Sequence, residues 1–177
     1  MSPSAKGATK PPLTAGRLLE RMRDTLELTL VEGTGSLERV ITSPNISSPG
    51  LVLAGYTERF PGHRLQVLGE TEVTYLDTRE PGERARVLQL FFSHAIPCVF
   101  VTKGLALPAA GVEAARAAGV PVFTSALKTN EFYTRIKPWL EDEFAPTTTI
   151  HGSVADVFGV GLLFIGRSGI GKSECVL

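Results

Sequence analysis

Cys98-Val99-Phe100-Val101, the alanine-rich stretch from Ala109 to Ala118 ended by Gly119, and Val120-Pro121-Val122-Phe123 together decide the fold. Each short apolar run is typical of a buried strand, and the alanine-rich stretch between them is typical of a helix. Gly119 can end that helix because glycine adopts the left-handed conformation without steric cost. A strand, a helix and a second strand at this spacing predict a right-handed parallel crossover, and hence an α/β fold.

Further elements are expected before this unit. Thr14 can cap a helix, because its hydroxyl can accept a hydrogen bond from a first-turn N–H group. The apolar face of that helix is expected to comprise Leu18, Leu19, Met22 and Leu26. The patterns that follow predict strands at Leu28–Val31, Arg39–Thr42 and Arg64–Leu68, the last because its apolar and polar residues alternate. They also predict a loop at Ser43–Gly50, and helices at Glu70–Leu76 and Gly82–Phe92.

Two elements are expected after the crossover unit. Thr129 is expected to cap a helix with Phe132, Ile136 and Leu140 on its inner face and a kink at Pro138. Beyond a boundary near Ala145–Thr149, His151–Phe158 and Val160–Ile165 are strand-like runs joined across Gly159. They predict a β-hairpin. We therefore expect a disordered tail at 1–12, an N-terminal α/β domain at 13–145, and the start of a second domain at 146–177.

The hairpin leads into Gly166-Arg167-Ser168-Gly169-Ile170-Gly171-Lys172-Ser173, a complete phosphate-binding (P-loop) pattern. A loop of this kind surrounds phosphate oxygens with backbone N–H groups, and its glycines let the backbone approach the ligand. Lys172 can place its ammonium group on the terminal phosphates, and the Ser173 hydroxyl can ligate Mg²⁺. The pattern predicts that this loop binds a polyphosphate together with a cation. The alternative is a glycine-rich turn between two core elements that binds nothing.

Composition excludes several classes of protein. Lys plus Arg and Asp plus Glu number 18 each, so overall charge gives no reason to expect nucleic acid or an acidic membrane as a partner. The apolar runs are too short for a membrane span, and the N-terminus lacks a signal-peptide core. The two cysteines do not suggest a disulfide framework, and the three histidines lack metal-ligand spacing. A cytoplasmic protein is expected.

Several stretches resemble one known family, HPr kinase/phosphorylase. The densest are Ala145-Pro146-Thr147-Thr148-Thr149-Ile150-His151-Gly152, Val157-Phe158-Gly159-Val160-Gly161, and the loop from Gly166 to Glu174. Others are Arg64–Glu72, Cys98–Leu105 and Ala118–Val122. The resemblance extends from about Leu13 to Leu177.

The resemblance implies a bifunctional bacterial regulator of carbon metabolism. Members of the family phosphorylate a serine of the phosphocarrier HPr with ATP or pyrophosphate. They also remove that phosphate by phosphorolysis, with inorganic phosphate as acceptor and pyrophosphate as product. The resemblance further implies a homohexamer and an N-terminal domain similar to a substrate-binding domain of Mur ligases.

Residue by residue, the resemblance makes Gly166 through Ser173 the nucleotide-binding loop, Lys172 the catalytic lysine and Ser173 a magnesium ligand. His151 matches the active-site histidine of the family. An unperturbed imidazole pKa near 6.5 would let His151 respond to a neighbouring phosphate or carboxylate. From spacing alone, a structural hydrogen-bonding role ahead of Gly152 is the alternative for His151.

In the family, the aspartate that accepts the serine proton lies beyond the position of Leu177, as do a further acidic magnesium ligand and the helices that contact HPr. General-base assistance is typically worth ~10²–10⁴-fold in rate. We therefore expect the 177-residue polypeptide alone to be inactive as a kinase and to bind nucleotide poorly. The other readings are a different P-loop kinase or NTPase, and a non-catalytic module in which residues 13–145 mediate oligomerisation or sense a metabolite.

Overall fold

The computed structural model describes residues 10–147, 152–166 and 169. Two compact units are present: one comprises Pro12–Ala145, and the other contains a β-hairpin that lies within Pro146–Leu177. In the part of the chain that is described, no helix has the length and apolar character that crossing a membrane requires.

A five-stranded sheet forms the centre of the larger unit. Its strands are β1 (Leu28–Glu32), β2 (Ile46–Ser47), β3 (Leu65–Leu68), β4 (Val99–Val101) and β5 (Val122–Ser125). Their order across the sheet is β1-β5-β4-β3-β2. β2, β3, β4 and β5 run parallel, whereas β1 is antiparallel to β5. The mixed sheet and the parallel β4–β5 pair confirm the α/β fold expected from the crossover stretch.

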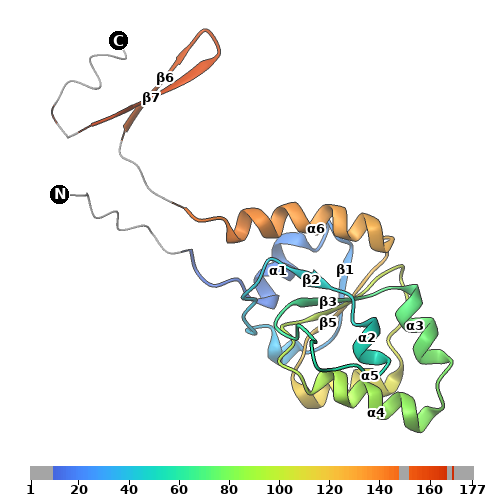
Figure 1. The fold of residues 1–177 in the computed structure, drawn as a ribbon. Helices are drawn as coiled ribbons and strands as arrows, with labels where there is room; N and C mark the ends of the chain where they lie inside the picture. Colours follow the sequence, from blue (N-terminus) through green and yellow to red (C-terminus); the bar gives the residue numbers. More distant parts are fainter. Residues whose placement is uncertain (1–9, 148–151, 167–168, 170–177) are drawn as a thin grey trace. The chain divides into compact units, whose positions relative to one another are not determined.

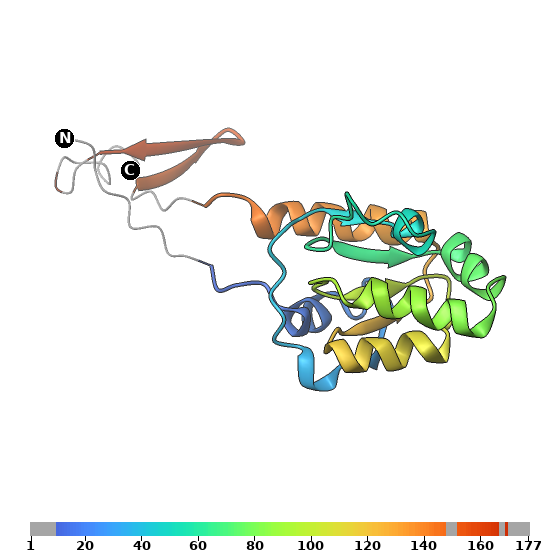
Figure 2. The same ribbon diagram turned by 60° about the horizontal axis from the view of Figure 1, so that its bottom comes forward.

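Helices cover both faces of this sheet (Figures 1 and 2). The helical segments are α1 (Ala15–Met22), a 3₁₀ turn (Thr34–Ser36), α2 (Gly50–Leu53), α3 (Glu70–Asp77), α4 (Pro81–Phe92), α5 (Ala109–Ala118) and α6 (Thr129–Phe144). α1 and α6 pack on one face, where their apolar side chains meet those of the strands. α2, α3, α4 and α5 pack on the other face.

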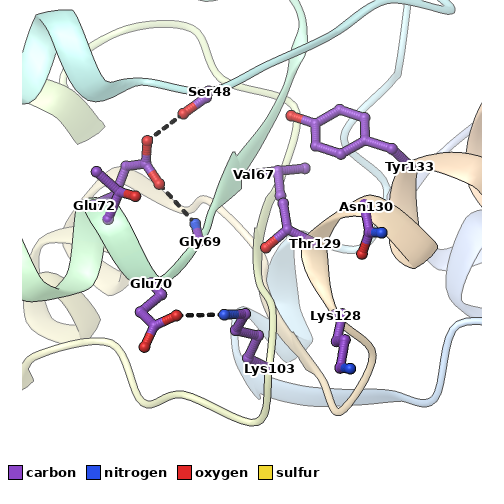
Figure 3. Close-up of a pocket in the computed structure, with 11 residues that line it drawn as sticks. Ser48, Val67, Gly69, Glu70, Glu72, Lys103, Lys128, Thr129, Asn130 and Tyr133 are labelled. Carbon is purple, nitrogen blue, oxygen red and sulfur yellow. Dashed lines mark hydrogen bonds and ion pairs between the residues drawn. The ribbon is translucent and has the colours of Figure 1, made fainter.

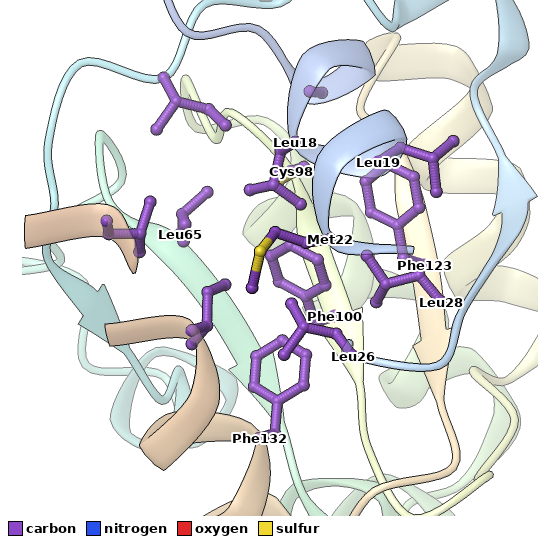
Figure 4. Packing of buried hydrophobic residues seen from close by; sticks show 14 of the residues in the cluster. Leu18, Leu19, Met22, Leu26, Leu28, Leu65, Cys98, Phe100, Phe123 and Phe132 are labelled. Atoms are coloured by element: carbon purple, nitrogen blue, oxygen red, sulfur yellow. The ribbon is translucent and has the colours of Figure 1, made fainter. Parts of the chain in front are cut away.

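The core under α1 and α6 is built around aromatic side chains (Figure 4). Phe100 of β4 stacks on Phe123 of β5 with ring centroids 5.4 Å apart, and lies 5.1 Å from Phe132 of α6. Leu18 and Met22 of α1 complete this layer. On β4, Phe100 faces this layer whereas its neighbours Val99 and Val101 join the opposite one, as the two-residue repeat of a strand requires.

Local signals explain where several helices begin and end. The Thr14 side chain accepts a hydrogen bond from the N–H of Arg17 at 3.2 Å, so the expected cap of α1 is confirmed. α5 ends at Gly119, whose φ of 61° lies in the left-handed region. A side chain at this position would be strained, which explains why glycine ends the helix.

Two strand-level expectations were wrong. Arg39–Thr42 forms only an isolated bridge, Thr14 to Val40. Its backbone bonds reach Leu13 and Ala15, and the pairing stops because the partner segment turns into α1 at Ala15. The stretch Ser43–Gly50 is not all loop, because β2 lies within it and extends the sheet beside β3.

Two expectations about side chains also need correction. The residues of β3 do not alternate between core and solvent, because all of Leu65–Leu68 is buried. Helices on both faces of a parallel sheet leave no solvent side. Thr129 is the first residue of α6 rather than its cap, and Lys128 occupies the cap position without a side-chain bond. The Thr129 hydroxyl instead lies 2.7 Å from that of Thr102.

Candidate functional site

The hairpin consists of β6 (Gly152–Val157) and β7 (Val160–Ile165), which pair antiparallel. Phe158 and Gly159 connect them with φ values of 53° and 81°. Two consecutive positive φ values in a two-residue connection define a type I′ turn, whose twist matches that of the strands. The Asp156 carboxylate accepts a hydrogen bond from the N–H of Gly159 at 2.9 Å. The expected hairpin across Gly159 is therefore confirmed.

The register of the hairpin determines which residues share its open end. Val157 pairs with Val160 beside the turn, and Gly152 pairs with Ile165 at the opposite end. A Cβ atom on Gly152 would lie 2.7 Å from the carbonyl oxygen of Phe164, so only glycine permits this approach. The start of β6 and the end of β7 are thus adjacent, and the phosphate-loop sequence begins from this end at Gly166.

The structure describes only part of the predicted phosphate loop. Gly166 follows β7 directly, and Gly169 has a φ of 83°, in the region that favours glycine. This conformation is the one for which the loop pattern supplies a glycine. The other predicted residues lie outside the described part of the chain: His151, Arg167, Ser168, Ile170, Gly171, Lys172 and Ser173. Of the predicted site residues, the structure therefore places Gly166 and Gly169.

Apolar side chains of the hairpin are exposed on β7 and near the turn. Val160, Leu163 and Ile165 are 60%, 50% and 62% exposed. Phe158 in the turn is fully exposed. These side chains have the composition of a core strand without its burial.

A second candidate site lies in the larger unit, where sequence reasoning placed none. A cavity of about 420 Å³ opens at the carboxyl ends of β3, β4 and β5, between the starts of α3 and α6 (Figure 3). Ligands of open α/β sheets bind at this edge. The sequence feature that could have indicated this site is the position of Lys103 and Lys128, each of which lies shortly after a predicted strand. Among the described residues no cluster of His, Cys, Asp or Glu could hold a metal ion.

One ion pair and the partial burial of one phenol determine the charge of groups that line this cavity. The Lys103 ammonium group bonds the Glu70 carboxylate and holds the pKa of Glu70 below its usual range. Partial burial raises the pKa of Tyr133, and the nearby Glu72 carboxylate raises it further. The Glu70 carboxylate therefore stays charged at neutral pH and the Tyr133 phenol stays neutral. Elsewhere, burial raises the pKa of the Cys98 thiol.

Comparison with known proteins identifies the family. Residues 13–140 match the family described as HPr Serine kinase N terminus, and residues 142–177 match the HPr Serine kinase C-terminal domain. The chain belongs to the HPr serine kinase family.

Curated relatives agree with this assignment. The chain is 40% identical over 160 residues to HPr kinase/phosphorylase of Geobacillus thermodenitrificans, covering 89% of this chain and 52% of the relative. It is also 40% identical over 154 residues to the proteins of the same name from Bacillus licheniformis and Brevibacillus brevis, covering 87% of this chain and 50% of each relative. The chain therefore spans about half the length of the curated relatives it matches.

One solved structure, the CBS and DRTGG domains of the regulatory region of a Clostridium perfringens pyrophosphatase, shows a weak similarity. It aligns with a TM-score of 0.49 at 13% identity, over 70% of this chain and 47% of that one. A similarity of this size supports no conclusion about the present chain.

Proposed function

We propose that the chain supplies the N-terminal unit and the nucleotide-binding loop of an ATP-dependent serine kinase and phosphorylase that acts on the phosphocarrier HPr. The supporting observation is the family match through residues 142–177, which includes a loop entered from β7 with Gly169 at positive φ. The names of the curated relatives support the kinase and phosphorylase activities. In this proposal, residues 13–145 form the N-terminal domain, 146–177 begin the kinase domain and 1–12 are a tail.

The loop residues have separate roles in this proposal. The backbone N–H groups from Gly166 to Ser173 hold the phosphates of ATP, while Lys172 neutralises charge on the transferred phosphoryl group. The Ser173 hydroxyl would hold Mg²⁺, which would neutralise charge on the phosphates. His151 precedes Gly152, the residue that pairs with Ile165, and we propose that it acts on the same phosphates.

The forward and reverse reactions use the same loop. In the kinase reaction, the serine oxygen of HPr bonds to the γ-phosphorus of ATP, the bond to ADP breaks, and the serine proton passes to a base. In the phosphorylase reaction, an oxygen of inorganic phosphate attacks the phosphoserine phosphorus. Pyrophosphate then forms and the serine oxygen regains a proton. We also propose a homohexamer in the cytoplasm, with neither nucleic acid nor membrane as a partner.

Phosphate transfer by the protein at its natural length tests this proposal. Purified HPr, ATP and Mg²⁺ are expected to yield phosphoserine. Lys172→Ala is expected to lower kcat by about 10²-fold or more, because charge on the transferred group loses a fixed cation. Lys137→Ala is the matched control, since Lys137 is an exposed lysine on α6. Equal loss in both variants, or no phosphoserine with the wild type, would contradict the proposal.

The reverse reaction and the 177-residue chain provide two further tests. Phosphorylated HPr with inorganic phosphate is expected to release pyrophosphate, and His151→Ala is expected to slow both directions by ~10²-fold or more if His151 takes part in proton transfer. The 177-residue chain alone is expected to transfer no phosphate. Phosphoserine formation by that chain would show that the base proposed to lie beyond Leu177 is not needed.

A further inference from the structure

The cavity at the carboxyl edge of the sheet lies within the larger unit, and the proposed reaction uses none of the residues that line it. It is bounded on one side by Gly69, Glu70 and Glu72 at the start of α3, and on the other by Lys128, Asn130 and Tyr133 at the start of α6 (Figure 3). Its volume of about 420 Å³ lies within the range of small-molecule sites.

The walls of the cavity are fixed by bonds among the strand ends. The Thr102 hydroxyl donates to the carbonyl of Leu68 at 3.3 Å and pairs with the Thr129 hydroxyl at 2.7 Å. The N–H groups of Lys103 and Gly104 donate to the carbonyls of Leu127 and Ser125, both at 2.8 Å. These bonds join the ends of β3, β4 and β5, so the cavity is preformed and needs little ordering to bind a ligand.

The two sides of the cavity differ in which polar groups are free to bind a ligand. On the α3 side the Glu72 carboxylate accepts bonds from the Gly69 N–H at 2.9 Å and the Ser48 hydroxyl at 2.5 Å, and Glu70 is paired with Lys103. On the α6 side the helix begins without a side-chain cap. Among the described residues, the Lys128 ammonium and the Tyr133 hydroxyl have no hydrogen-bond or ion-pair partner.

This asymmetry gives the cavity a definite polarity. The α6 side offers one unpaired cation, a phenolic donor and first-turn N–H groups that have no partner within the helix. The α3 side offers carboxylate oxygens that can accept bonds from hydroxyl groups. We propose that this cavity binds a small hydroxylated anion, with its phosphate or carboxylate group toward Lys128 and its hydroxyls toward Glu70 and Glu72. The proposal is independent of the kinase function.

Titration of the full chain tests the site with residue-level resolution. Inorganic phosphate and glycerol 3-phosphate are added at constant ionic strength, and backbone amide shifts are followed by NMR. Saturable shifts are expected at Asn130 and Glu131. The Lys172→Ala background separates this event from binding at the phosphate loop, because the α6 shifts are expected to persist there. Tighter binding of glycerol 3-phosphate would support a hydroxylated metabolite, whereas equal binding of both probes would overturn the role assigned to the α3 side.

Three variants decide whether the anion binds where we propose. Lys128→Gln is expected to weaken binding tenfold or more, whereas Lys137→Gln, on the exposed face of the same helix, is expected to leave it unchanged. Asn130→Asp puts a carboxylate in the first turn of α6, where it favours the helix but repels an anion. It is expected to abolish binding without lowering the unfolding temperature. Shifts at α6 that survive both Lys128→Gln and Asn130→Asp, or no shifts at all, would overturn the proposal.

Discussion

β4 and β7 are both short apolar strands, but they have opposite surroundings. Val99, Phe100 and Val101 of β4 are fully buried between two layers of helices. Val160, Leu163 and Ile165 of β7 are each at least half exposed. The two strands are chemically similar but differ greatly in burial. Apolar composition therefore predicts that a segment forms a strand and that the strand can be buried. It does not identify the element that covers the strand.

The largest expected effect comes from the same substitution made in each region. Phe100→Ala removes a ring that contacts two other aromatic residues, and is expected to lower the free energy of unfolding of the larger unit by about 3–5 kcal/mol. Phe158→Ala removes a fully exposed ring, and is expected to change this free energy of unfolding by less than about 0.5 kcal/mol. Urea denaturation followed by circular dichroism measures both. Comparable losses would show that the two regions do not differ in burial as described.

A buried hydroxyl provides the next contrast. Ser125 at the end of β5 donates a hydrogen bond to the carbonyl of Leu26 at 2.5 Å, away from solvent. Ser125→Ala leaves that carbonyl unpaired, and is expected to lower the free energy of unfolding by about 1–3 kcal/mol. Ser153→Ala, near the start of β6 at a partly buried position, is the control and is expected to be close to neutral. A neutral Ser125→Ala would mean that water replaces the lost donor.

The turn of the hairpin is expected to be improvable. Phe158 adopts a φ of 53°, which costs an L-residue with a large side chain roughly 1–2 kcal/mol. Phe158→Asn creates the Asn-Gly pair that type I′ turns favour, and is expected to slow hydrogen exchange of the β6–β7 amides about fivefold or more. The larger unit is expected to show no change. Unaltered exchange in the hairpin would argue against a type I′ turn.

The smallest expected effect depends on pH and belongs to the larger unit alone. The Arg116 guanidinium bonds the Glu32 carboxylate at 2.9 Å and, together with the Gly33 N–H, holds the pKa of Glu32 below its usual value. Because the folded pKa is the lower one, the resulting stability is present at neutral pH. It is lost as pH falls from about 4.3 through the folded value.

Glu32→Gln removes this dependence, so the stability difference between variant and wild type is expected to shrink between pH 6 and pH 3. Thermal unfolding at several pH values measures it, and high salt is expected to reduce it because Arg116 is two-thirds exposed. A difference that grows at low pH would have the wrong sign for this ion pair.

The elements predicted best were those whose signals are local. Thr14 capped α1 and Gly119 ended α5 because a side-chain acceptor and a left-handed residue act within a few residues of their position. β2 was missed because a strand so short shows no period, and it exists only through its pairing with β3. The role of Thr129 was misjudged for a similar reason. Its hydroxyl bonds Thr102, which is distant in sequence.

The two candidate sites differ in the same way, one in a contiguous segment and the other formed by distant segments. The predicted phosphate loop is contiguous, so its pattern was visible in the sequence, and Gly169 has a positive φ that glycine tolerates. The roles of His151, Lys172 and Ser173 stay predictions. The cavity between α3 and α6 is assembled from segments that follow three different strands. No window of sequence contains it, and only the parallel arrangement of those strands brings its residues together.

The two-residue turn at Phe158 and Gly159 has a consequence for how this family can vary. An extra residue at the turn that slides β6 past β7 by one place would reverse which side chains face each way along the ladder. It would also separate Gly152 from Ile165, which pair at the end of the hairpin from which Gly166 continues. Evolution of this segment is therefore expected to proceed mainly by exchange of residues, with single-residue insertions and deletions at 158–159 rare.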